Sequence, residues 1–252
     1  MKRILYSVVA ITAIITACSE QYAESYTIQG ATSVASLDQQ KLYLKEHHSD
    51  DTAAAVLDSC EVIHGEFAFS GKFDTIRMAE MAIVDGNLPI VIEKGDINVS
   101  IERTGQKVSG SPHNDKLYDF REKHIQLENL MYELGHKETQ MILEGIDEYT
   151  IAQRLTAESS MLMARIDSLE TRFIIDNADN VLGPYAFYEL TRQYRYPVMT
   201  PQIEEILVKV SDKFKNDPYV SSYCKSAQDI LARMRGETDD EAAPADNNGQ
   251  QQ

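Results

Sequence analysis

The sequence predicts an α+β fold, in which an N-terminal antiparallel β-sandwich or partly open barrel is followed by a helical domain. Three observations lead to this prediction. Between residues 26 and 110, apolar residues recur with a period of two, and turn residues separate the short runs. After Gly110 the period changes to 3.6. Several X-Pro pairs then mark the starts of successive helical segments.

The N-terminal region contains short candidate strands with clear faces. Phe67 and Phe69 alternate with polar or small residues, which places both rings on one side of a strand. Ile97, Val99 and Ile101 alternate in the same way. About seven short strands at this spacing are typical of an antiparallel sandwich or partly open barrel. The predicted strands are 26–30, 41–45, 54–63, 66–70, 77–84, 88–93 and 97–102.

The second region, residues 111–236, is expected to be a helical domain. Ser111-Pro112 combines a capping residue with proline at the first helical position, and Gly135 is the expected end of that helix. A second long helix is expected over residues 149–175. Three X-Pro pairs open the remaining helices: Gly183-Pro184 (residues 185–195), Thr200-Pro201, and Asp217-Pro218, whose helix ends at Gly236. The apolar stripes of these helices are expected to form the core.

The start of the chain has the layout of a secretory signal peptide. Lys2 and Arg3 precede an apolar run of about 12 residues, which is shorter than the roughly 20 residues that a membrane-spanning helix needs. The segment Ile15-Thr-Ala-Cys18 resembles the lipobox of bacterial lipoproteins. This resemblance implies that residues 1–17 are removed and that Cys18 carries lipid. Residues 18–25 would then form a lipidated tether to the membrane, without a spanning segment.

The charge of the chain excludes one class of partner. The formal net charge is −16, and removal of Lys2 and Arg3 with the signal peptide makes it −18. Such a field repels nucleic acid and anionic headgroups, so no nucleic-acid partner is expected. Residues 237–252 contain no large apolar residue and are expected to be a disordered acidic tail.

The chain has two cysteines besides Cys18, and the sequence does not decide whether they form a disulfide. Cys60 lies in a strand pattern and Cys224 in a helix pattern. An oxidising compartment permits a bridge between them, and two buried thiols are the alternative. The sequence has no C-x-x-C pair, which excludes a dithiol of the thioredoxin type.

The order of several short motifs in residues 26–120 resembles a known family. These motifs are Tyr26-Thr-Ile-Gln-Gly30, Lys41-Leu-Tyr-Leu44, Leu57-Asp-Ser59, Gly65-Glu-Phe-Ala-Phe-Ser-Gly71, Ile92-Glu-Lys-Gly-Asp-Ile97 and Val108-Ser-Gly-Ser111. Together, and behind a lipobox, they resemble the domain of unknown function at the N-terminus of many Bacteroidetes lipoproteins. In that family a helical segment and a thioredoxin-like domain of the TlpA or AhpC type follow.

Residues 180–227 are similar to the family's linker helices, but no thioredoxin-like sequence or redox cysteine pair follows them. The family's redox activity is therefore not expected of this chain. The resemblance implies the fold of the N-terminal module, the lipid anchor, and a location in the cell envelope at the outer membrane.

Several groups of polar residues are candidates for chemical sites, but none predicts catalysis or a cofactor. His47-His48-Ser49-Asp50-Asp51 gathers metal-capable side chains, but a solvated loop is expected because adjacent side chains of an extended loop point apart. The other histidines lack H-x-x-x-H or H-E-x-x-H spacing, so no metal site is predicted.

Asp58-Ser59 lacks a G-x-S-x-G context and is expected to be a buried or edge polar pair that fixes strand register. The carboxylates of the first two helices could support glycosidase chemistry, but a solvated face is expected: Glu128, Glu133, Glu138, Glu144, Asp147 and Glu148.

The densest aromatic cluster is the candidate binding surface. It consists of Tyr185, Phe187, Tyr188, Tyr194, Tyr196 and Pro197. Such clusters stack sugars or line peptide grooves, while packing of the third helix is the structural alternative. The chain has no Trp, which disfavours a carbohydrate platform. A binding surface is therefore expected at Tyr185, Tyr188, Tyr194 and Tyr196, or on exposed strand edges.

Three functions remain open from the sequence. The preferred one is a non-enzymatic outer-membrane lipoprotein that acts as a binding or interaction module, with an envelope protein as a candidate partner. The second is an accessory protein of thiol-disulfide exchange, and the third is an envelope hydrolase whose site is assembled by folding. The first is preferred because the sequence shows no catalytic constellation.

Overall fold

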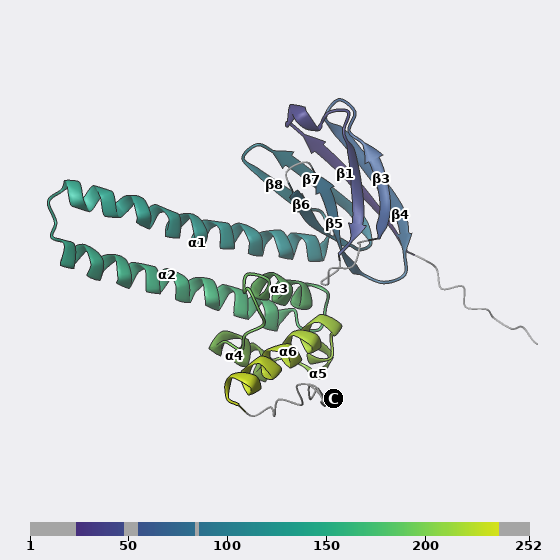
Figure 1. Cartoon of the computed structure of the whole chain (residues 1–252). Coiled ribbons are helices and arrows are strands. Elements are labelled where there is room, and N and C mark those ends of the chain that lie inside the picture. Colours follow the sequence, from purple (N-terminus) through teal and green to yellow (C-terminus); the bar gives the residue numbers. More distant parts are fainter. Residues whose placement is uncertain (1–23, 48–54, 84–85, 237–252) are drawn as a thin grey trace, which may run out of the picture.

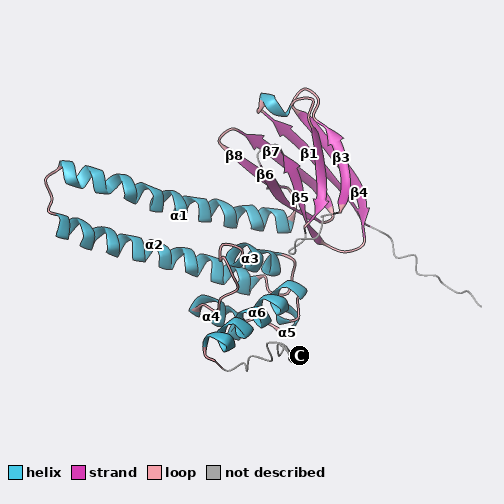
Figure 2. Ribbon diagram, in the orientation of Figure 1, coloured by secondary structure: helices cyan, strands magenta, loops and turns pink. Residues whose placement is uncertain are grey.

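A computed structural model describes residues 24–47, 55–83 and 86–236 of the chain. In this part, strands occupy residues 24–109 and helices occupy residues 112–234, which confirms the predicted α+β class (Figures 1 and 2). The predicted signal peptide, Cys18 with most of its tether, and the acidic tail lie outside the described residues. None of the described helices combines the length and apolar content that crossing a membrane requires.

The strands form two four-stranded sheets. The first sheet has the order β4-β1-β7-β8 and the second has the order β3-β2-β5-β6, and among the described residues no barrel closes. The strands are β1 (Glu24–Thr32), β2 (Lys41–Glu46), β3 (Val56–Glu61), β4 (Glu66–Phe73), β5 (Arg77–Ile83), β6 (Gly86–Ile92), β7 (Gly95–Glu102) and β8 (Gly105–Ser109). A short 3-10 helix, η1 (Ala35–Leu37), connects β1 to β2.

One pairing departs from the expected antiparallel sandwich. β1 pairs with β7 in parallel, with Ile28 opposite Ile97, so the first sheet is mixed. The reason is that the chain crosses from β6 in the second sheet to β7 in the first, and β7 enters beside β1 in the same direction. β1 still pairs antiparallel with β4 on its other side.

The predicted alternation of the strands is confirmed by burial. Phe67 and Phe69 of β4 are buried, and Ala68 between them is exposed. The same holds for the apolar residues of β7. β6 is different, because all residues from Leu88 to Ile92 are buried. One of its faces belongs to the sandwich core, and the first turns of α1 cover the other.

β8 is a strand that the sequence pattern did not predict. Only one of its five side chains, Val108, is buried, so the sequence shows no alternation of apolar and polar residues there. The strand forms because β7 and β8 are joined by a tight turn and pair over five residue positions, from Asn98–Ser109 to Glu102–Gly105.

The helices form a long hairpin and a smaller group at its base. α1 (Pro112–Leu143) and α2 (Glu148–Asp176) run side by side and project away from the sandwich (Figure 1). The group at the base consists of α3 (Leu182–Thr191), α4 (Pro201–Lys209), α5 (Asp212–Lys215) and α6 (Pro218–Met234). α3 begins before the predicted start at Tyr185, and Pro184 is accommodated in its first turn.

The expected end of the first helix at Gly135 is wrong. α1 continues to Leu143, because its buried stripe extends through Met141 against α2. The chain leaves the helix at Gly145, whose φ of +77° is the left-handed conformation that follows many helices. Gly135 has ordinary helical surroundings and no close neighbour at its Cβ position.

Candidate functional site

A cavity of about 690 Å³ lies where the sandwich meets the helices at the base of the hairpin. Its sandwich side comes from the end of β2 and the start of β5, and its helical side comes from α3, α5, α6 and the turn before α3. The volume falls in the range of small-molecule sites. The rings that line it are His47, His113, Tyr185, Tyr188, Phe214 and Tyr219.

His47 follows β2 directly and is held by a carboxylate. Its Nδ1 donates to Oε1 of Glu80 over 2.7 Å, and the other oxygen of Glu80 accepts from Asn87 over 2.7 Å. The hydrogen bond from His47 is the main cause that lowers the pKa of Glu80, so this carboxyl group is ionised at neutral pH. The ring of His47 makes edge-to-face contacts with Tyr185 and Tyr188, with centroid distances of 5.1 and 5.0 Å.

This burial corrects one expectation from the sequence. The segment that starts at His47 was expected to be a solvated loop, but the side chain of His47 is only 8% exposed. Its backbone N–H also donates to the carbonyl of Met78 on β5, which extends the β2–β5 pairing by one residue. The rest of that segment, residues 48–51, lies outside the described residues.

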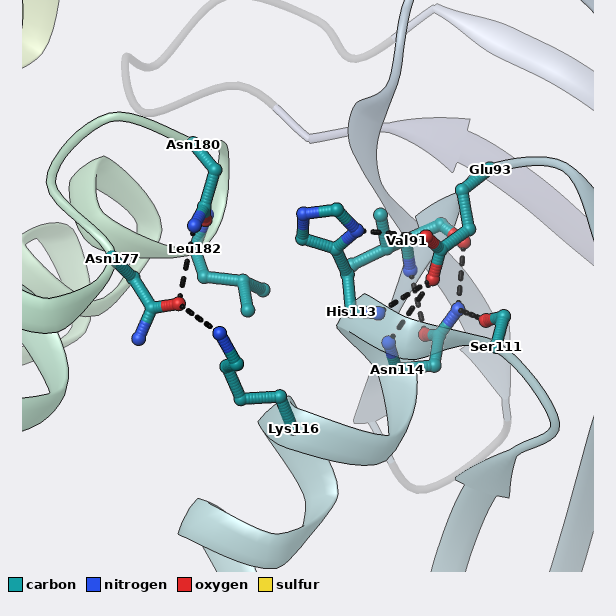
Figure 3. Close-up of polar contacts among 9 residues, drawn as sticks. All are labelled: Val91, Glu93, Ser111, His113, Asn114, Lys116, Asn177, Asn180 and Leu182. Carbon is teal, nitrogen blue, oxygen red and sulfur yellow. Dashed lines mark hydrogen bonds and ion pairs between the residues drawn. The ribbon is translucent and has the colours of Figure 1, made fainter.

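His113 makes a second pair of the same kind, from the start of α1 (Figure 3). Its Nδ1 donates to Oε2 of Glu93 over 2.7 Å, while Oε1 of Glu93 accepts from the backbone N–H groups of His113 and Asn114 at 2.8 and 3.3 Å. The side chain of Glu93 is 5% exposed. Burial raises the pKa of Glu93, but the hydrogen bonds from His113, Ser111 and the backbone outweigh it, so the pKa lies below its usual range.

Glu93 therefore has the capping role that the sequence assigns to Ser111. Ser111 has the extended backbone of a capping position, but its side chain makes no capping hydrogen bond. Its hydroxyl accepts instead from Nδ2 of Asn114 over 2.9 Å (Figure 3). A carboxylate near the N-terminus of a helix is favourable because the free N–H groups and the helix dipole are positive there. The sequence does not reveal this role, because Glu93 precedes the helix by about 20 residues and a capping motif includes only residues next to the helix start.

Two side chains of α1 close the edge of the second sheet. Asn114 accepts from the N–H of Val91 and donates to the carbonyl of Val91, each over 2.8 Å, so its amide replaces a neighbouring strand (Figure 3). The hydroxyl of Tyr118 donates to the carbonyl of Pro89 over 2.9 Å. These contacts hold β6 against the start of α1.

The turn between α2 and α3 is fixed by a chain of amides. Lys116 Nζ and Asn180 Nδ2 both donate to Oδ1 of Asn177, at 3.2 and 3.1 Å (Figure 3). Asn180 Oδ1 accepts from the N–H of Leu182 over 2.9 Å, at the start of α3. The helical wall is thus tied to α1 as well.

Only some residues of the predicted aromatic surface line the cavity. Tyr185 and Tyr188 line the cavity, as residues three apart on one helix face do. Phe187, between them, does not line the cavity but is fully buried and packs against Phe214 and Tyr223. Tyr194 is partly buried against the core, while Tyr196 is 52% exposed and is not part of the cavity wall.

The charged groups at the cavity already have partners within the chain. Arg77 forms ion pairs with Asp74 and with Glu46, the latter at 3.7 Å. Lys213 Nζ donates to the carbonyl of Asp179 over 2.7 Å. Asp217 Oδ1 accepts from the first N–H groups of α6, those of Tyr219 and Val220. The described residues contain no group of three or more His, Cys, Asp or Glu side chains placed to hold a metal ion.

The other polar candidates have structural surroundings. Asp58 and Ser59 lie on β3 at the edge of the second sheet, where Oδ1 of Asp58 accepts from the N–H of Ser59 over 2.7 Å. The pair therefore lies at a sheet edge, which is one of the two predicted positions, and its predicted role in fixing strand register stays a prediction. The carboxylates considered for glycosidase chemistry are all exposed, as expected for a solvated face: Glu128, Glu133, Glu138, Glu144, Asp147 and Glu148.

Cys60 and Cys224 are free thiols in the structure, on β3 and α6. Both are half-buried. Burial raises the pKa of Cys60 to about 11 and also raises the pKa of Cys224. Neither thiol therefore has the lowered pKa of a reactive cysteine.

Comparison with known proteins identifies one region of the chain. No curated protein matches the chain. A family model described as "Domain of unknown function (DUF4369)" matches residues 26–117, and no match to a thioredoxin-like domain is found. The matched region runs from β1 into α1 and includes His47, Glu93 and His113, whereas Tyr185 and Tyr188 lie outside it. Residues 26–117 of this chain therefore match the model of the DUF4369 family, as the resemblance predicted.

Proposed function

We propose that the chain is a non-enzymatic lipoprotein of the cell envelope that binds a small ligand in the cavity between the sandwich and α3. The observation that carries this proposal is a cavity of about 690 Å³ whose walls are mostly aromatic and apolar and come from both parts of the protein. Such cavities, with a few placed polar groups, are typical of ligand sites.

Hydrogen bonds to groups at and near the cavity favour a single conformation of its walls. Carboxylates hold both imidazoles, and Asn114 and Tyr118 hold α1 against β6. A site held in one conformation loses little entropy when a ligand enters. The described residues that line the cavity include no serine, threonine or cysteine, so the wall supplies aromatic contacts rather than a nucleophile of those kinds.

A test of the cavity uses two tyrosines from the same predicted surface. A set of small aromatic compounds is screened against the full-length protein by ligand-observed NMR. The compound with the highest affinity is expected to bind Tyr188→Ala about tenfold more weakly, because the variant loses the ring that lines the cavity. Tyr196→Ala is the control and is expected to bind like wild type, since Tyr196 lies outside the wall. An equal loss in both variants, or none in either, would show that the cavity is not the site.

A second test addresses the membrane anchor. We propose lipid on Cys18, supported by the lipobox-like segment before it. Cells that express the protein are fed a palmitate analogue, and label is expected on wild type and on Cys60→Ala but not on Cys18→Ala. Equal labelling of wild type and Cys18→Ala would contradict the anchor.

A further inference from the structure

His47, which lines the cavity, has a ring nitrogen without a hydrogen-bond partner. Nε2 of His47 is the only buried side-chain nitrogen or oxygen among the described residues for which none is found. The side chain is more than nine-tenths buried, so bulk water does not serve as the partner. Nearly all buried polar atoms in proteins are hydrogen-bonded, so an exception calls for an explanation, and a bound ligand is one.

Whether Nε2 needs a donor or an acceptor as its partner depends on whether the other ring nitrogen carries the proton. Ionised Glu80 can only accept a hydrogen bond, so Nδ1 of His47 carries the proton. In the neutral ring Nε2 is then an acceptor. Glu80, itself held by Asn87, and the rings of Tyr185 and Tyr188 fix the orientation of this acceptor.

The surroundings limit the charge of a ligand. Arg77, Lys213 and Asp217 are already engaged by other groups of the chain, so an ionic ligand would have to break existing contacts. The wall also contains aromatic and aliphatic side chains, among them Tyr188, Phe214 and Ile76. An apolar or aromatic body fits this wall without loss of polar contacts.

From these observations we infer that the ligand is an uncharged compound with an aromatic or apolar body and a hydroxyl or N–H group that donates to Nε2 of His47. This inference rests on the proposed function, since it assumes that the cavity is the binding site. It adds the class of ligand and the residue that selects it. His113 does not have this role, because its side chain is 23% exposed and water can reach it.

The test uses two probes that differ in one donor. 2-Naphthol carries a hydroxyl that can donate, and 2-methoxynaphthalene has the same ring system without a donor. Full-length wild-type protein is expected to bind 2-naphthol at least about tenfold more tightly, as measured by titration calorimetry, because only this probe satisfies the buried acceptor. In His47→Phe the two affinities are expected to become equal, while 2-methoxynaphthalene keeps its wild-type affinity.

The matched control is His136→Phe, the same substitution at an exposed position of α1. It is expected to keep the wild-type preference for 2-naphthol. A direct readout needs no variant: the ¹⁵N resonance of His47 Nε2 in the wild-type protein is expected to move upfield with 2-naphthol and to stay unchanged with 2-methoxynaphthalene.

The outcomes separate the two proposals. If both probes bind the wild-type cavity equally, the cavity is a binding site but Nε2 does not select the ligand, and the inference is wrong while the proposed function stands. If neither probe binds although the Tyr188 test identifies a ligand, the inferred ligand class is wrong. If neither probe nor any screened compound depends on Tyr188, both proposals are wrong.

Discussion

Asn114→Ala is expected to lower the free energy of unfolding by about 3 kcal/mol, because the substitution leaves two backbone groups of β6 buried without partners. Asn114 is fully buried, and its amide pairs with both the N–H and the carbonyl of Val91. The substitution also removes the hydrogen bond from Asn114 to the hydroxyl of Ser111. An unpaired buried donor or acceptor costs about 1–3 kcal/mol, which exceeds the small gain in helix propensity from alanine.

Urea unfolding of both proteins measures this loss. The control is Gln126→Ala, which removes an amide from an exposed position of the same helix and is expected to change stability by less than about 0.5 kcal/mol. Hydrogen exchange gives a local readout, because the amide of Val91 should exchange faster in Asn114→Ala. Equal stability of wild type and Asn114→Ala would mean that α1 does not seal the edge of β6.

The strands with the clearest sequence pattern are those with repeated apolar positions on one face. β4 and β7 bury alternate residues, so their pattern is visible in the sequence. β8 has one buried side chain and exists because of its pairing with β7, a contact that a local pattern does not encode. The parallel pairing of β1 and β7 is hidden for the same reason, since it depends on where the chain crosses between the sheets.

The cavity was only partly predictable. The spacing of Tyr185 and Tyr188 places both on one face of α3, and the aromatic cluster pointed to this helix. The segment that begins at His47 is predicted to be a solvated loop because adjacent side chains of an extended loop point apart. The burial of His47 depends instead on Glu80 in another strand and on α3 far along the chain. Short-range patterns describe single elements, whereas this site is formed where three distant segments meet.

Glu93→Gln is expected to lower the free energy of unfolding by about 2 kcal/mol at pH 7, because a neutral amide interacts less strongly with the start of α1 and with His113. The effect is expected to depend on pH. The pKa of Glu93 lies below its ordinary value of 4.5 in the folded protein, so the ionised carboxylate stabilises the fold. This stabilisation is fully present above pH 4.5 and is lost as the pH falls through the lowered pKa.

The stability difference between wild type and Glu93→Gln should therefore be largest near neutral pH and shrink under acid conditions. Urea unfolding at several pH values between about 7 and 3 measures the difference. Glu122→Gln, at an exposed position of α1, is the control and is expected to differ little from wild type at any of these pH values. A difference for Glu93→Gln that stays constant as the pH falls would show that the charge of Glu93 does not stabilise the junction. The loss would then come from the changed shape and hydrogen bonding of the side chain alone.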